Sequence, residues 1–97
     1  MREDEEIEAR VIEFAKLYDE IKEILYGQLP KIDLSDNRRG YTIFTSTSRF
    51  SENETLEDAV TDLDISIARE FNDSEVSFLV IPMTYRKDYP GRVIYKR

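Results

Sequence analysis

Carboxylates are the side chains of this chain that could do chemistry, because the usual catalytic and metal-binding residues are missing. The 97 residues include 21 aspartates and glutamates but no histidine and no cysteine. Without imidazole or thiol groups, the chain lacks the commonest general base, the commonest metal ligand and any thiol nucleophile. This composition favours a protein that is not an enzyme, and we predict no catalytic residue, no metal site and no cofactor.

One carboxylate pair has the spacing of a possible metal site. Asp62 and Asp64 flank Leu63, and they follow a segment that ends at Thr45-Ser46. In minimal nucleotidyltransferases a helix, a strand, a Gly-Ser turn and an Asp-x-Asp strand come in this order, and the aspartates hold magnesium. This part of the chain resembles that pattern, which implies phosphoryl transfer. It departs from it where Thr45 replaces the glycine that lets the backbone approach a phosphate. The aspartates also lie in a helical pattern, where residues two apart do not share a face.

Acidic residues concentrate between positions 51 and 75, which hold nine carboxylates and one basic side chain. Apolar residues recur every three or four positions from Leu56 to Phe71, which predicts an amphipathic helix with an acidic outer face. Such a face can bind the basic groove of a partner, since a row of carboxylates imitates the phosphates of a duplex. The alternative is that it only keeps the protein soluble. The predicted partner-binding residues are Glu54, Glu57, Asp58, Asp62 and Asp64.

Basic and aromatic residues gather in the segments expected to be strands and turns. Positions 76 to 97 hold five basic side chains and one acidic one. Arginine and lysine neutralise phosphates and tyrosine rings stack on bases, so nucleic-acid binding through a basic, tyrosine-rich C-terminal hairpin is the alternative function. A charged sheet edge with packed tyrosines, or contact with an acidic patch on a second copy, would give the same composition. The residues of this basic surface are Arg38, Arg39, Tyr41, Arg86, Lys87, Arg92 and Lys96.

Two helices and three strands are predicted to position these side chains. Residues 2–26 carry apolar side chains at steps of three and four and contain no proline or glycine, so they predict one long helix that ends at Gly27. Residues 41–47 are β-branched and aromatic and predict a strand. Residues 76–83 are apolar at both alternating sets of positions, which predicts a strand in the middle of the sheet, covered on both faces.

The C-terminal segment is predicted to fold back on that strand. Residues 84–87 continue the strand, residues 88–91 form a turn, and residues 92–97 return antiparallel to it. The prediction is an α+β fold, a single two-layer domain over residues 1–97 in the order α-β-α-β-β. Its three-stranded mixed sheet ends in a C-terminal β-hairpin. The first two strands are expected to run parallel, because a helix joins them.

These features together predict a small non-enzymatic interaction or regulatory protein. We expect its acidic helical surface to dock on a protein partner, with nucleic-acid-binding proteins among the candidates. Two helices on one face of a small sheet would leave the other face open, so either the helices straddle the sheet or the open face meets a partner. A dimer with a second copy or a hetero-complex is expected on this ground. No apolar run approaches the ~20 residues that span a bilayer, and no basic-then-apolar leader is present. We therefore expect a cytoplasmic protein without membrane contact.

Overall fold

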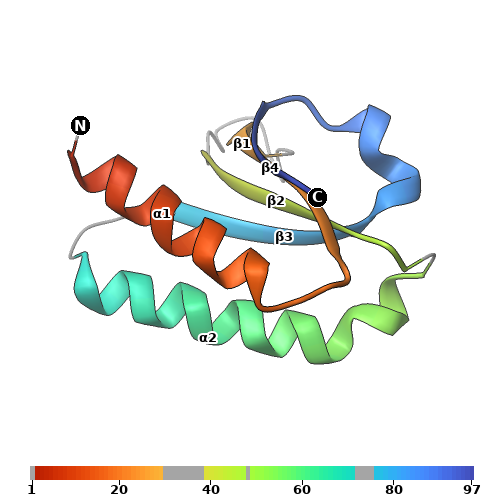
Figure 1. Ribbon diagram of the computed structural model, residues 1–97, viewed down its shortest axis with the longest axis horizontal. Helices are drawn as coiled ribbons and strands as arrows, with labels where there is room; N and C mark the ends of the chain where they lie inside the picture. The colour runs from red at the N-terminus through yellow and green to blue at the C-terminus, as the bar shows by residue number, and fades with distance from the viewer. Residues whose placement is uncertain (1, 30–38, 48, 72–75) are drawn as a thin grey trace.

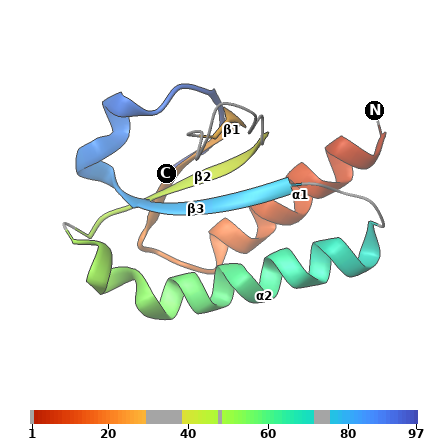
Figure 2. The same cartoon turned by 180° about the vertical axis from the view of Figure 1, so that it is seen from behind.

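A four-stranded mixed sheet separates two helices on one side from a short 3-10 helix on the other (Figure 1). The structure, a computed structural model, describes residues 2–29, 39–47, 49–71 and 76–97. Seen from behind, α1 and α2 again lie together on one side of the sheet (Figure 2). In chain order the elements are α1 (Arg2–Lys16), β1 (Ile21–Gln28), β2 (Arg39–Thr45), η1 (Phe50–Asn53), α2 (Glu54–Glu70), β3 (Val76–Pro82), η2 (Met83–Asp88) and β4 (Arg92–Lys96).

The strands lie in the order β3-β2-β1-β4. β2 and β3 are parallel neighbours joined through α2, as predicted, and β1 runs antiparallel to both β2 and β4. β2 and β3 approach so closely at Gly40 that a Cβ atom there would lie 2.0 Å from the carbonyl oxygen of Ser77. The predicted α+β class is therefore confirmed, but the sheet has four strands instead of three.

β1 is the element that the sequence interpretation missed, because residues 21–26 were assigned to the first helix and Gly27 to its end. α1 ends at Lys16, and a turn follows in which the Ile21 amide donates to the Tyr18 carbonyl at 3.1 Å. Within β1, Ile24 packs in the core on the helix side, whereas Leu25 packs in the cluster on the opposite face. A strand buried on both faces shows no polar alternation, and the positions of its apolar residues happened to continue the helical stripe of α1.

The position of β3 was also predicted wrongly. It is a strand with apolar contacts on both faces, since Val80 packs on the helix side and Ile81 on the opposite side. It is nevertheless an edge strand and not the central one, because β1 and β2 occupy the middle of the sheet. β3 is therefore covered on both faces although, among the described residues, one of its backbone edges has no neighbouring strand.

The predicted C-terminal hairpin does not form. Residues 84–87 belong to η2 instead of extending β3, and the chain then crosses the far face of the sheet to β4 at the opposite edge. Gly91, with φ of +152°, makes the sharp entry into β4. β4 is antiparallel as expected, but its partner is β1. The prediction failed because the strand that β4 pairs with had been assigned to a helix.

Both faces of the sheet are buried, although by different cover. On the helix side, apolar residues of α1 and α2 pack against the sheet in one cluster that includes Val11, Ile43 and Ile67. On the far face, a smaller cluster of Leu25, Phe44 and Ile81 lies against the segment that contains Met83 and Tyr89. The face that the sequence interpretation left open is thus partly closed by the chain's own η2 segment.

Candidate interaction surface

The five predicted acidic residues all lie on α2, which is a helix as expected. The helix turns a buried stripe of Leu56, Val60, Leu63 and Ile67 towards the sheet. This stripe fixes the orientation of every other side chain on the helix. Glu54, Glu57, Asp58 and Asp62 are exposed, and Asp64 is half-buried.

The carboxylates of α2 do not form one face but divide between the outer surface and a flank. Asp58 and Asp62 are four residues apart and point outwards, opposite the buried stripe. Glu57 lies on the flank next to β3, and the helical period places Asp64, seven residues further on, on the same side of α2. Partial burial raises the pKa of Asp64 above its usual range, because the carboxylate loses hydration.

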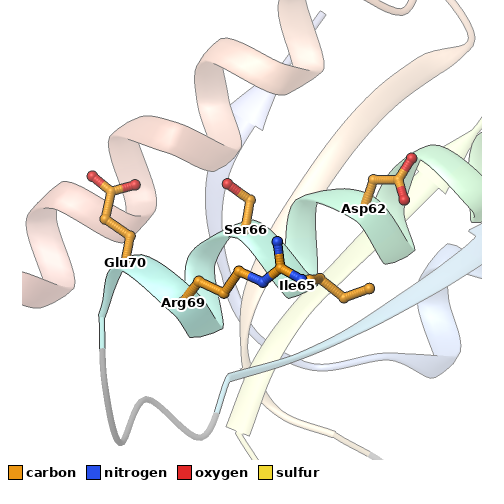
Figure 3. A pocket seen from close by; sticks show the side chains of 5 residues that line it. All are labelled: Asp62, Ile65, Ser66, Arg69 and Glu70. Carbon is orange, nitrogen blue, oxygen red and sulfur yellow. The ribbon is translucent and has the colours of Figure 1, made fainter.

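The opposite flank of α2 faces α1. Figure 3 shows Ser66 and Glu70 reaching from α2 towards α1, beside Asp62. The Arg10 guanidinium on α1 donates to the Glu70 carboxylate and, at 3.0 Å, to the Ser66 hydroxyl. An open hollow of about 540 Å³ lies here, lined by Asp62, Ile65, Ser66, Arg69 and Glu70. The contacts of Arg10 with Glu70 and Ser66 join the two helices, so these two residues serve the fold, and Asp62 at the border of the hollow takes no part in these contacts.

A groove lies between α2 and the edge strand β3. It has a volume of about 420 Å³ and is lined by Glu57, Val60, Thr61, Phe78, Leu79, Val80 and Ile81. The Thr61 hydroxyl donates a hydrogen bond to the Glu57 backbone carbonyl at 3.0 Å, so it is satisfied within α2. The other side chains that line the groove are apolar, except for the Glu57 carboxylate. The sequence interpretation missed this groove, because it placed β3 inside the sheet.

The predicted basic surface is divided among separate places. Arg38 lies outside the described residues. Arg39 and Arg92 come together at one end of the sheet, 5.9 and 6.0 Å from the centre of the Tyr26 ring. Arg92 also donates to the Glu8 carboxylate at 2.8 Å, a contact that raises the pKa of the guanidinium further. Lys96 is exposed at the other end of β4.

Arg86 and Lys87 lie on η2, across the far face of the sheet. Lys87 is exposed, but Arg86 stands over the Phe44 ring at 5.6 Å and forms an ion pair with the buried Glu23. Arg97, at the end of the chain, donates to the Tyr18 carbonyl at 2.9 Å and lies 3.6 Å from Asp19. Several cations of the C-terminal segment therefore hold the fold together.

Tyr41 is a core residue, so the expectation that its ring could contact a ligand is wrong. It is 3% exposed, and its ring lies between those of Tyr26 and Phe78, with centroids 4.9 and 5.6 Å away. Burial raises the pKa of the Tyr41 phenol strongly, and the carboxylates of Glu8 and Asp4 add to the effect. The three rings connect β1, β2 and β3 in one aromatic row.

The Asp-x-Asp pair does not form the strand that the nucleotidyltransferase pattern requires. Asp62 and Asp64 lie within α2, where one points outwards and the other lies on the β3 flank. In residues 2–29, 39–47, 49–71 and 76–97, no group of three or more histidines, cysteines, aspartates or glutamates is placed to hold a metal ion. In the same ranges, no helix combines the length and the apolar character needed to cross a membrane.

No protein-family model matches this chain, and neither a curated protein nor a solved structure is significantly similar to it.

Proposed function

We propose that this protein is a small non-enzymatic interaction protein that docks α2 on a basic surface of a protein partner. The supporting observation is that, in the described part of the chain, three carboxylates of α2 lack ion-pair partners whereas three arginines of the C-terminal segment have them. Arg86, Arg92 and Arg97 pair with carboxylates of their own chain. Among the described residues, no basic side chain pairs with Glu57, Asp58 or Asp62.

Unpaired carboxylates on one helix repel one another. Asp58 and Asp62 are four residues apart, a spacing at which like charges destabilise a helix. A cationic partner would remove this repulsion, and the field of the acidic face would accelerate the encounter at low ionic strength. The repulsion between carboxylates that destabilises α2 in the unbound protein therefore favours binding of a cationic partner. The cytoplasm is the proposed location, since a chain without cysteine needs no oxidising compartment.

Nucleic-acid binding has weaker support as a function. Arg86 and Arg92 are already paired with Glu23 and Glu8, and Tyr41 is buried. The net charge of −7 also opposes approach to a phosphate backbone. A mobility shift with single-stranded or duplex DNA or RNA at low salt would revive this alternative.

The proposed docking is tested with two charge-neutralising double variants that remove the same number of carboxylates. Asp58→Asn with Asp62→Asn changes the outer face of α2, and Glu5→Gln with Glu6→Gln changes α1. Both are compared with the original protein for binding to labelled lysine-rich peptides at increasing salt. We expect the α2 double variant to bind the peptides more weakly and the α1 double variant to bind them as the original protein does. Equal loss in both variants would mean that net charge, and not α2, attracts the peptides.

A further inference from the structure

The two edges of the sheet differ in how they are protected. β4 has five residues, begins and ends with the cations Arg92 and Lys96, and pairs with β1 through a register shift. Short length, charged side chains and irregular pairing are the usual devices that stop an edge strand from pairing further. β3 has seven residues without a single charge, and its pairing with β2 has no shift from Val76 to Pro82. Only the final Pro82 limits pairing at this edge.

The unprotected edge is also the one that borders the groove. Within the described ranges, no strand lies beyond β3, whose alternate residues turn their N–H and C=O groups away from β2. Phe78 is half-buried on the helix side of β3, whereas Leu79 is half-buried on the far face, and Val60 of α2 forms the opposite wall of the groove. The groove thus offers a row of backbone hydrogen-bonding groups beside an apolar surface, the combination that binds extended peptides by strand addition.

We propose that β3 and α2 bind an extended, basic segment of the protein partner as an added strand of the sheet. The segment's backbone pairs with the free edge of β3, and its apolar side chains enter the groove beside Val60 and Phe78. Lysine or arginine side chains two positions away from an apolar one lie on the same side of the segment, since alternate residues of a strand share a face, and reach Glu57 and Asp64 on the flank of α2. This inference rests on the proposed function and adds to it the conformation of the partner and the strand that it meets.

Charge selects a basic segment as the occupant. Glu57 lines the groove directly, and Asp64 lies two turns further along the same flank. A cation near Asp64 would offset the lost hydration that disfavours its ionised form. An acidic segment would meet repulsion from both carboxylates, so the flank discriminates between partners as well as attracting one.

The same charges oppose a second copy of this chain. If two β3 edges paired antiparallel, a two-fold axis perpendicular to the sheet would relate the copies. Both α2 helices would then lie on the same face, next to the junction. Their Glu57-bearing flanks would face each other, and such like-charge juxtaposition across an interface is costly. The dimer expected from the sequence is therefore the less favoured occupant of this edge.

The test uses a labelled peptide of repeated Lys-Thr-Val-Thr units, which places lysine and valine in alternation on one face of a strand, with fluorescence anisotropy as the readout. In a strand, successive backbone N–H groups point to opposite edges. A second peptide of the same sequence is N-methylated at every other residue, which removes the N–H donors of one edge. A third is N-methylated at the intervening residues, which removes the donors of the other edge. Because each backbone hydrogen bond contributes to affinity, we expect one methylated peptide to bind about tenfold more weakly or worse. Equal binding of all three peptides would overturn strand addition.

Protein variants locate the site. Leu79→Lys places a charge on the β3 edge, and its control, Val93→Lys, places one on β4, where Val93 is 45% exposed. Glu57→Gln changes the groove, and its control, Glu5→Gln, removes one exposed carboxylate from α1. We expect Leu79→Lys and Glu57→Gln to weaken binding several-fold and both controls to leave it unchanged. Thermal unfolding reports whether the Leu79→Lys variant still folds. If it does not fold, the comparison of the three peptides on the original protein still tests strand addition.

Failure of this inference is distinguishable from failure of the proposed function. If α2 docks without strand addition, the three peptides bind alike and only the Asp58→Asn and Asp62→Asn double variant weakens binding. If no peptide binds at low salt, both proposals are overturned. A dimer in sedimentation velocity that Leu79→Lys dissociates would replace the peptide with a second copy as the occupant of the β3 edge.

Discussion

The Arg86 Nε atom lies 3.1 Å from the Glu23 Oε2 atom, on the face of the sheet that η2 covers. The N–H direction is not aligned for a hydrogen bond, so the contact is an ion pair above the Phe44 ring. Glu23 is 4% exposed, which makes Arg86 its cover as well as its counter-charge. This pair attaches η2 to β1 and closes the face that a two-helix domain would otherwise leave open.

Removing Arg86 should therefore cost more than removing Glu23. Arg86→Ala leaves a buried carboxylate without its counter-charge, and we expect a loss of about 2–4 kcal/mol in the free energy of unfolding. Glu23→Gln leaves Arg86, which is partly exposed, and we expect about 1–2 kcal/mol. Urea unfolding of both single variants and the double variant measures the coupling. Additive effects would show that the pair does not stabilise the fold.

Gly40 is required by the close contact of β2 and β3. A Cβ atom at this position would lie 2.0 Å from the Ser77 carbonyl oxygen, which the backbone cannot avoid without breaking the strand pair. We expect Gly40→Ala to destabilise the protein by about 3 kcal/mol or more. Gly27→Ala is the comparison, because its Cβ atom would lie 3.1 Å from the Gly91 Cα atom and needs a smaller shift. Denaturant unfolding ranks the two variants, and a larger loss for Gly27→Ala would contradict this account.

Tyr41 should make the fold sensitive to alkali. Burial raises its pKa in the folded state well above the value of about 10 for an unfolded chain. The folded protein thus favours the neutral phenol, and this stability is complete below about pH 10 and is lost as the pH rises beyond it. Tyr41→Phe should remove that loss, whereas Tyr85→Phe, at a position 43% exposed, should not. Unfolding measured from neutral to strongly alkaline pH, with tyrosinate absorbance, checks both; identical alkaline curves would contradict the assignment.

Asp64 should oppose folding slightly at neutral pH. Its raised pKa means that the folded state favours the protonated carboxyl, so its contribution is most favourable at acid pH. That contribution is lost as the pH rises through the pKa of the unfolded chain and then that of the folded state. We expect Asp64→Asn to be at least as stable as the original protein at pH 7, with the exposed Asp62→Asn as control. A clear loss of stability in Asp64→Asn alone would reveal a favourable contact of the carboxylate.

The sequence predicted the helix that is buried on one face only, and it predicted the pairing of the two strands that this helix connects. α2 shows a clean helical period between Leu56 and Ile67, and the parallel pairing of β2 with β3 follows from the helix between them. β1 was hidden because Ile24 and Leu25 are buried on opposite faces, which removes the alternation typical of a strand. One missed strand then misplaced β3 in the centre of the sheet and paired β4 with the wrong neighbour.

The sequence predicted only part of the candidate site. The acidic residues of α2 follow from the helical pattern, including the exposure of Asp58 and Asp62. The separation of Glu57 and Asp64 onto the β3 flank depends on which side of α2 meets the sheet, and the groove depends on β3 having a free edge. Both are properties of the four-stranded topology, which local periodicity does not encode.

Hydrogen exchange of the β3 amides, with and without the Lys-Thr-Val-Thr peptide, tests the docking proposal most directly. We expect alternate amides between Val76 and Ile81 to exchange rapidly in the free protein and to become protected when the peptide is added. The amides of β4 should not change. Protection of the whole of β3 in the free monomer, or no added protection with saturating peptide, would contradict the proposal that this edge accepts a strand.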